Sequence, residues 1–379
     1  MINDIADVIN ISVSNPAESE YDIFVGLEHY DVGEPIITRY GSTKMLTTAC
    51  KKFSAGDILL ARRNVYLRRA GLVKFDGLTS GDSIVIRIKP NLSIEGVNSQ
   101  EISRLLPFVL NTNAFWDFAN TNSDGTMSKR LSPQMLLSYE FNLPPYSNQK
   151  PLADKLWAAY NLKASKLKLI DAIDEMVKSQ FIEMFGGNKV DYVQLSSLCS
   201  TFIDGDWIES KDQSESGIRL IQTGNVGCGE YKDKGDKAKY ITEDTFNKLH
   251  CTEIYPGDIL ISRLPDPVGR ACVLPEGLGK CVTAVDCTII RFSEKILPNF
   301  FVAYTNTPEY LTQIKSTLAG TTRLRVSRGN LGKVKIPVPS IEQQRTFVSI
   351  AEQADKSKFE LKKSIEAIDK VIKSLINNI

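Results

Sequence analysis

The chain has 379 residues, of which 42% are hydrophobic, so it is long enough for two or three folded domains with substantial cores. Its 46 lysines and arginines nearly balance 45 acidic residues, so net charge does not attract it to nucleic acid and only local basic patches can do so. Without a signal-like N-terminus, a long apolar span or a CxxC pair, the sequence predicts a cytosolic protein with no membrane partner, whose seven cysteines remain thiols.

The first globular segment is predicted to be rich in strands. Gly56 and Asp57 form a turn signal before an apolar run, and a second β-prone run follows at 82–87. The segment 51–74 carries seven basic residues and a single acid, which is the strongest local charge in this half. Because the arginine fork suits both phosphate and the guanine edge, the candidate DNA-binding residues here are Arg62, Arg63, Arg68 and Arg69.

A loop and a long helix are expected next. Lys129 and Arg130 follow the Gly125-Thr126 pair and extend the set of candidate DNA-binding residues. Two prolines at 144–145 then separate the globule from a helix over about 149–185, which Gly186-Gly187 terminates. This helix carries an apolar seam with spacing three and four, made by Ile170, Ile173 and Val177.

The second half of the chain repeats the first. The segment 254–263 matches 53–62 at an offset of 201, and 365–374 matches 170–179 at an offset of 195. Solenoid repeats have periods of roughly 20 to 50 residues, so this period indicates a duplicated domain with its helix. The candidate DNA-binding residues of the second half are Gln222, Asn225, Arg263, Arg270, Thr322, Arg323, Arg325 and Arg328.

These polar and basic residues have a second interpretation. A basic run is often a solvated surface with scattered salt bridges, and recurrence in both halves is what favours the DNA-binding interpretation. Gln222 and Asn225 follow a β-prone run, where amides suit the edge of adenine but are equally common as turn residues.

The C-terminal segment 341–378 is predicted to be a second long helix. Its seam consists of Leu361, Ile365, Ile368, Ile372 and Leu375. The two helices either pack separately on their own domains or pack on each other as an antiparallel coiled coil, and the matching seams favour the second arrangement. Some 30 helical residues span roughly 45 Å, slightly more than the 34–36 Å of one turn of B-DNA.

Motifs for catalysis and metal binding fail at specific positions. Asn142-Leu143-Pro144-Pro145 has leucine where an amino-methyltransferase motif needs a polar group, and 224–229 has glycines in the wrong order for a dinucleotide site. Glu209-Ser210-Lys211 lacks a distant metal carboxylate, since Asp204 and Asp206 stand too close to it. With no zinc spacing or nucleophilic triad, the sequence predicts a non-catalytic chain without a metal or cofactor of its own.

The order of globule, long helix, globule and long helix resembles the specificity subunit of type I restriction-modification enzymes. Three motifs share this resemblance: PGDILISR at 256–263, AGTTR at 319–323 and IPVPSIEQQ at 336–344. The resemblance covers the whole chain and is closest in the second half. In the first half, Gln149-Lys150 is what remains of the last motif.

The resemblance implies an α+β fold with two similar globular α/β target recognition domains, separated by two long helices that form an antiparallel coiled coil. The expected segments are 1–148 and 188–340 for recognition, and 149–187 and 341–379 for the helical spacers. Each domain would read one half of a bipartite, asymmetric sequence in double-stranded DNA.

The resemblance also implies partner proteins. Two modification subunits would dock on the helices, through residues such as Leu162, Leu169 and Met176, and restriction subunits would join them. S-adenosylmethionine, ATP and Mg²⁺ would bind to these partner subunits rather than to this chain.

Two other classes of function stay open at the sequence level. The chain is then either a stand-alone DNA methyltransferase or nuclease with an unrecognised site, or a duplicated coiled-coil adaptor that binds only protein. Binding of S-adenosylmethionine or cleavage of DNA by the purified chain would indicate the first. Salt-dependent binding to duplex DNA would argue against the second.

Overall fold

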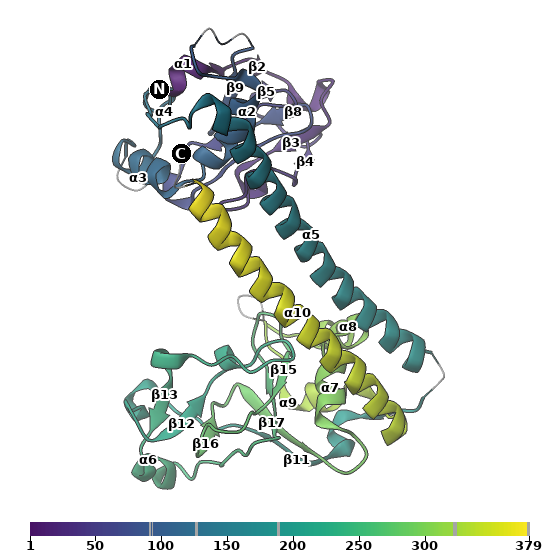
Figure 1. Ribbon diagram of the computed structural model, residues 1–379. Coiled ribbons are helices and arrows are strands. Elements are labelled where there is room, and N and C mark those ends of the chain that lie inside the picture. Colours follow the sequence, from purple (N-terminus) through teal and green to yellow (C-terminus); the bar gives the residue numbers. More distant parts are fainter. Residues whose placement is uncertain (91, 93, 126–127, 188–189, 321–323, 377–379) are drawn as a thin grey trace. The chain divides into compact units, whose positions relative to one another are not determined.

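The computed structural model describes residues 1–379 except 91, 93, 126–127, 188–189, 321–323 and 377–379 (Figure 1). Of the expected DNA-binding residues, Thr322 and Arg323 therefore lie outside the described residues. The chain forms two compact units, Met1–Lys166 with Lys363–Ile379 and Leu167–Lys362. Among the described helices, none is long and apolar enough to cross a membrane.

The first unit contains two sheets that share a core. The first sheet is antiparallel and has the order β1-β9-β6-β7. Its strands are β1 (Ala6–Ile9), β9 (Ser83–Ile88), β6 (Ile58–Ala61) and β7 (Ala70–Leu72). The second sheet has the order β2-β5-β8-β3-β4, with β2 (Ser12–Val13), β5 (Cys50–Phe53), β8 (Gly77–Thr79), β3 (Ile23–Val25) and β4 (Gly41–Ser42).

Strand β6 explains why the predicted apolar run does not alternate with polar residues. Ile58 and Leu60 join one hydrophobic cluster, while Leu59 and Ala61 join another. Because both faces of this central strand are buried, four consecutive apolar residues are needed. The first cluster also contains side chains of the helices that cover this sheet, α2 (Ser99–Val109), α3 (Asn113–Thr121) and α4 (Pro133–Leu137).

The second unit repeats this architecture. Its main sheet has the order β11-β17-β14-β15, with β11 (Cys199–Asp204), β17 (Cys287–Phe292), β14 (Ile259–Ser262) and β15 (Ala271–Val273). Two smaller sheets pair β13 (Lys239–Ile241), β12 (Ile218–Ile221) and β16 (Cys281–Thr283), and β10 (Tyr192–Gln194) with β18 (Lys335–Pro337). The helices are α6 (Glu243–Lys248), α7 (Pro298–Tyr304), α8 (Pro308–Ser316) and α9 (Arg328–Gly332).

Capping residues show the duplication at atomic detail. Thr112 accepts a hydrogen bond from the third residue of α3, and Thr307 does the same for α8. Ser132 and Ser327 cap α4 and α9 in the same way. Each hydroxyl satisfies a backbone N–H that the first helical turn leaves unpaired, so the same residue type begins the same helix in both units.

The two long helices were correctly predicted, with small shifts at their ends. Helix α5 spans Tyr146–Phe185 and α10 spans Ile341–Ile376. In the first unit, Ile372 of α10 packs against a hydrophobic cluster that joins residues of α2 and α5, namely Leu105, Phe108, Ala153 and Leu156. In the second unit, the ring of Phe347 of α10 lies 5.3 Å from that of Phe181 of α5.

The helices therefore pack on each other and also on the globules. Both of the alternatives considered for the sequence, packing on the domains and packing of one helix on the other, are thus present together. The predicted seam residues are half-buried or buried on the helices, and Ile368 is 9% exposed. The described structure is an α+β fold with two similar sheet-rich units and two long paired helices.

The cysteines behave as the sequence indicates. All seven are free thiols. Five of them, Cys50, Cys251, Cys272, Cys281 and Cys287, are buried, whereas Cys199 is half-buried and Cys228 is exposed. Most of these side chains thus serve as small hydrophobic core residues.

Candidate nucleic-acid interface

The basic residues of the first unit meet where β6 ends. The backbones of Asp124 and Arg130 exchange two hydrogen bonds of 3.0 and 2.8 Å, which close a hairpin loop. The N–H of Leu131 then donates to the carbonyl of Arg62 at 2.9 Å and ties this loop to the end of the strand. A cavity of about 520 Å³, here called the arginine pocket, lies at this junction and is lined by Arg62, Arg63, Asp124, Gly125, Ser128 and Arg130.

One carboxylate holds two exposed guanidinium groups beside the arginine pocket. Asp82 lies 3.4 Å from Arg63 and 3.4 Å from Arg130. The two arginine side chains are 45% and 50% exposed, whereas Asp82 is 25% exposed. Two cations share one anion, so the cluster keeps a net positive charge, and free N–H donors remain to bind a phosphate or a base edge.

The second unit repeats one arginine–aspartate pair of this cluster. Arg325 lies 3.0 Å from Asp286 and corresponds to Arg130, which lies 3.4 Å from Asp82. The backbones of Ala319 and Arg325 close the corresponding hairpin with hydrogen bonds of 3.0 and 2.9 Å. Arg325 is 46% exposed, so each unit presents an accessible arginine held by an aspartate at an equivalent place.

Arg263, the counterpart of Arg62, has a different environment from the one expected. Its side chain is only 4% exposed and donates to the carbonyl of Val285 at 2.6 Å, with Asp204 at 3.4 Å. Burial lowers the pKa of this guanidinium, and Asp204 partly opposes that shift. Arg263 therefore supports the loop from inside and does not offer accessible donors as Arg63 and Arg130 do.

Arg62 and Arg263 share an unusual feature. The Nε atom of each is buried and has no hydrogen-bond partner among the described residues. A buried guanidinium donor without a partner costs free energy, and both copies of the site retain it. The Nε atom of Arg69 is in the same condition, so this feature is not confined to the two equivalent arginines.

Arg69 and Arg270 are structural residues rather than exposed contacts. The guanidinium of Arg270 is 8% exposed and donates to the carbonyls of Val226, Leu264, Pro267 and Thr223 at 2.6–2.8 Å. Arg69 donates to the carbonyls of Leu27 and Arg63 at 2.9 and 3.2 Å. These donors already bind backbone oxygens that link two loops, so the structure gives both arginines a structural role in place of accessible donors.

The amides predicted to read bases turn out to shape a turn. Asn225 is 5% exposed, accepts from the backbone N–H of Gln222 at 3.0 Å and donates to Lys232 at 2.9 Å. In the first unit, Nδ1 of His29 accepts from the N–H of Gly26 at 2.9 Å at the same place. Asn225 is therefore the turn residue of the alternative interpretation, while Gln222 is half-buried at the start of that turn.

The remaining basic candidates differ in the exposure and the hydrogen bonding of their side chains. Arg68 has a left-handed backbone with φ of 52° and donates to Asn113 at 2.7 Å. Lys129 is half-buried and donates to the carbonyl of Asn120 at 2.9 Å. Arg328, the first residue of α9, is exposed.

Two residues of the cluster were missed as site residues by the sequence analysis, Asp82 and Asp286. Each stands just before an equivalent strand, β9 or β17, at an offset of 204. An acidic residue by itself does not suggest a DNA-binding site. The recurrence of aspartate at equivalent positions in both halves was the sequence signal that could have identified these two residues.

Helix α5 presents a strip of exposed apolar residues. Leu162, Leu169 and Met176 are 51%, 49% and 46% exposed and follow each other at intervals of seven residues. This interval places them on one face of the helix, beside the half-buried seam. No group of three or more potential metal ligands occurs among the described residues.

Residues 188–369 match the family model described as the type I restriction modification DNA specificity domain. The chain is 23% identical over 253 residues to the putative type I restriction enzyme MjaX specificity subunit of Methanocaldococcus jannaschii, a match that covers 62% of this chain and 57% of that protein. It is 21% identical over 288 residues to the MjaVIII specificity subunit of the same organism, covering 69% of this chain and 65% of that protein. The chain thus spans less than two thirds of the length of either relative.

Two solved structures share the fold. A chain from a study of complex assembly and conformational transition in the type I restriction-modification system has a TM-score of 0.57 at 16% identity, covering 98% of this chain and 97% of that chain. The type I restriction-modification S subunit of M. genitalium has a TM-score of 0.51 at 13% identity, covering 100% and 94%. At such low identity, these likenesses concern the fold alone.

Proposed function

We propose that the chain, whose residues 188–369 match the model of the type I restriction modification DNA specificity domain, is a type I restriction-modification specificity subunit that recognises a bipartite, asymmetric sequence in double-stranded DNA. The observation that carries this proposal is the repeated cluster in which Asp82 holds Arg130 and Asp286 holds Arg325. Two such clusters on equivalent units match a target with two halves. Because the units differ in sequence, the two halves of the target differ too.

Each cluster can both position the protein on the duplex and recognise bases. Exposed arginines on a loop can bind phosphate oxygens, which fixes the register on the duplex, or the O6 and N7 atoms of guanine in the major groove. Arg63, Arg130 and Arg325 are the accessible groups for these contacts. The aspartates orient the guanidinium groups before DNA binds.

In this proposal the chain itself is not catalytic and needs no cofactor. Two modification subunits transfer the methyl group from S-adenosylmethionine, and restriction subunits use ATP and Mg²⁺. The modification subunits dock on the long helices, and the exposed strip of Leu162, Leu169 and Met176 supports this surface on α5.

Co-expression with a modification subunit, followed by mapping of methylated adenines in the cell's DNA, tests the function directly. The expected result is methylation within two fixed half-sites separated by a constant spacer, and only when this chain is present. The Arg325→Ala variant is expected to relax the preference at one position of one half-site. Methylation that does not depend on this chain would contradict the proposal.

The purified chain separates the proposal from an enzyme or an adaptor. We expect it to bind duplex DNA with an affinity that falls steeply as salt rises, because phosphate contacts release counterions. It is expected neither to bind S-adenosylmethionine nor to cleave DNA alone. Binding of S-adenosylmethionine would indicate a methyltransferase, and failure to bind any duplex would indicate a protein adaptor.

A further inference from the structure

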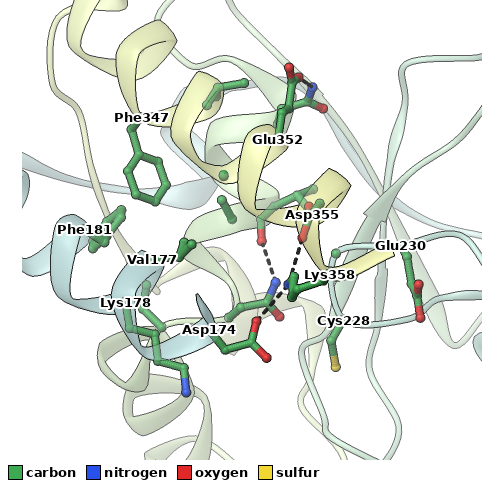
Figure 2. A pocket seen from close by; sticks show the side chains of 18 of the residues that line it. Asp174, Val177, Lys178, Phe181, Cys228, Glu230, Phe347, Glu352, Asp355 and Lys358 are labelled. Atoms are coloured by element: carbon green, nitrogen blue, oxygen red, sulfur yellow. Dashed lines mark hydrogen bonds and ion pairs between the residues drawn. The ribbon is translucent and has the colours of Figure 1, made fainter. Parts of the chain in front are cut away.

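Each unit contains an ion pair between α5 and α10 that is the repeat of the other. In the first unit, Nζ of Lys163 lies 3.0 Å from Asp369 and also 3.0 Å from Glu34. In the second unit, Nζ of Lys358 lies 2.8 Å from Asp174 (Figure 2). Lys358 follows Lys163 by 195 residues, and Asp369 follows Asp174 by the same number, so one interaction occurs twice.

The two ion pairs obey a single alignment of the helices. In an antiparallel helix pair, the numbers of facing residues add up to a constant. The residue numbers of Lys163 and Asp369 add up to 532, as do those of Asp174 and Lys358. The two pairs therefore agree on one register.

The lysines occupy seam positions, where apolar residues would otherwise lie. Lys163 stands seven residues before Ile170, and Lys358 stands seven residues before Ile365. Their side chains are only 19% and 22% exposed, so each ammonium group is largely removed from water. A polar residue at a seam position lowers the stability of a coiled coil and in return specifies its register.

The apolar seam alone does not define this register. Its pattern repeats about every seven residues, so a slip of seven leaves apolar residues facing apolar residues. For Lys163, such a slip replaces Asp369 by Lys362 in one direction and by Ile376 in the other. A partly buried lysine would then face a like charge or an apolar residue in place of Asp369, and Glu34 alone would compensate its charge.

The second lysine imposes the same restriction. For Lys358, a slip of seven residues replaces Asp174 by Leu167 or by Phe181. In Figure 2, Lys358 points toward both Asp174 and Asp355, and the latter lies 2.8 Å away on the same helix. Asp355 accompanies Lys358 in every register, so only Asp174 reports the alignment.

From these contacts we propose that Lys163 and Lys358 are register-determining residues, which select one alignment of α5 against α10 through Asp369 and Asp174 and thereby fix the length of the unread DNA spacer. The statement about the spacer rests on the proposed function, whereas the statement about register does not. Both lysines act as positioning residues and contact no DNA in this scheme.

Spin labels on the full-length chain measure the register directly. Labels incorporated as unnatural amino acids at Asn161 and Glu366 report on the first unit, and labels at Asp171 and Lys356 report on the second; all four positions are exposed. Pulsed electron paramagnetic resonance is expected to give one distance population for each label pair in the unsubstituted chain.

The test variant replaces Lys163 and Lys358 together by leucine. The chain is expected to stay folded, because leucine extends the apolar seam and the aspartates left without a lysine, Asp369 and Asp174, are 42% and 45% exposed to water. Each label pair should then show additional distance populations, since a slip of seven residues moves one label about 10 Å along the helix axis. A single, unchanged population in this variant would overturn the proposal.

Two controls separate register from general packing. Lys166→Leu adds an apolar residue at another seam position, the counterpart of Leu361, and leaves both ion pairs intact, so one population is expected. The double variant K163R/K358R keeps both charges and should also give one population. Extra populations in either control would mean that any seam substitution disturbs the helices, which contradicts a specific role for the lysines.

The spacer is measured in the same variants by mapping methylated adenines after co-expression with the modification subunit. The leucine double variant is expected to accept additional spacer lengths, whereas the controls keep one. Extra distance populations with an unchanged spacer would overturn the link to DNA. If the unsubstituted chain directs no methylation, the proposed function fails, and the distance measurement still decides the question of register.

Discussion

Gln149 and Gln344, which stand 195 residues apart, anchor the first turns of α5 and α10 through the same set of hydrogen bonds. The amide N–H group of Gln149 donates to Gly96 and Pro144 at 2.7 and 3.1 Å, and that of Gln344 donates to Lys295 and Pro339 at 2.8 and 2.9 Å. Each side-chain oxygen also accepts one backbone N–H. Both side chains are fully buried, so each long helix is fixed to its globule by one glutamine.

Removal of this anchor is predicted to destabilise the chain. Gln344→Ala leaves two carbonyl groups and the N–H of Leu297 without a partner, at a cost of about 1–3 kcal/mol in the free energy of unfolding. Urea denaturation followed by circular dichroism measures this loss. Arg345→Ala, at the exposed neighbouring position, is the matched control and should change stability by less than about 0.5 kcal/mol.

Neutralising an aspartate of the cluster is predicted to strengthen DNA binding. Asp82→Asn removes the carboxylate that Arg63 and Arg130 share, and both guanidinium groups then become free to bind phosphate. Exposed ion pairs contribute about 0–1 kcal/mol each, so affinity for non-specific duplex should rise by about three- to tenfold at low salt. Fluorescence anisotropy at several salt concentrations checks this, and an unchanged or weaker affinity would contradict it.

Arginine substitutions are predicted to separate base contacts from phosphate contacts. Arg130→Ala should cost about 1–3 kcal/mol and relax one position of one half-site if its guanidinium binds a guanine. A uniform loss over all sequences, with a smaller salt dependence, would assign it to phosphate instead. The corresponding Arg325→Ala should act on the other half-site, because the clusters belong to different units.

Arg270→Ala is predicted to affect folding rather than sequence preference. Its side chain donates to four backbone carbonyls inside the second unit, and the substitution leaves those acceptors buried without a donor. Thermal unfolding should therefore occur at a lower temperature than in Arg328→Ala, whose side chain is exposed. A variant of Arg270 with unchanged stability and altered target preference would contradict the structural role.

The main features of the fold were predictable because they are periodic or repeated. The turn at Gly257-Asp258 and the apolar run after it gave β14, and the seam of Ile365 and Ile368 gave α10. The repeat also indicated that both halves share one architecture. Short strands such as β4 and β18 have no such pattern, and their pairing depends on distant residues.

The roles of individual arginines were less predictable. Arg63 and Arg270 are both basic residues beside a strand, yet one is exposed and the other is 8% exposed. Composition does not separate them, because the difference arises from loops that supply carbonyl groups from elsewhere in the chain. The seam lysines were missed for a related reason, since a charged residue hides the seven-residue pattern until its partner on the other helix is known.

The repeated lysine–aspartate pair has a consequence for shorter chains. Lys163 and Asp174 both belong to α5, so a polypeptide ending after this helix would contain one lysine and one aspartate of the kind that form these ion pairs. Two such molecules in antiparallel alignment would offer every lysine the aspartate of the other molecule, and these are the same contacts that the full chain makes within one polypeptide. Such a dimer would carry the same recognition module twice, and by its two-fold symmetry it would select a palindrome.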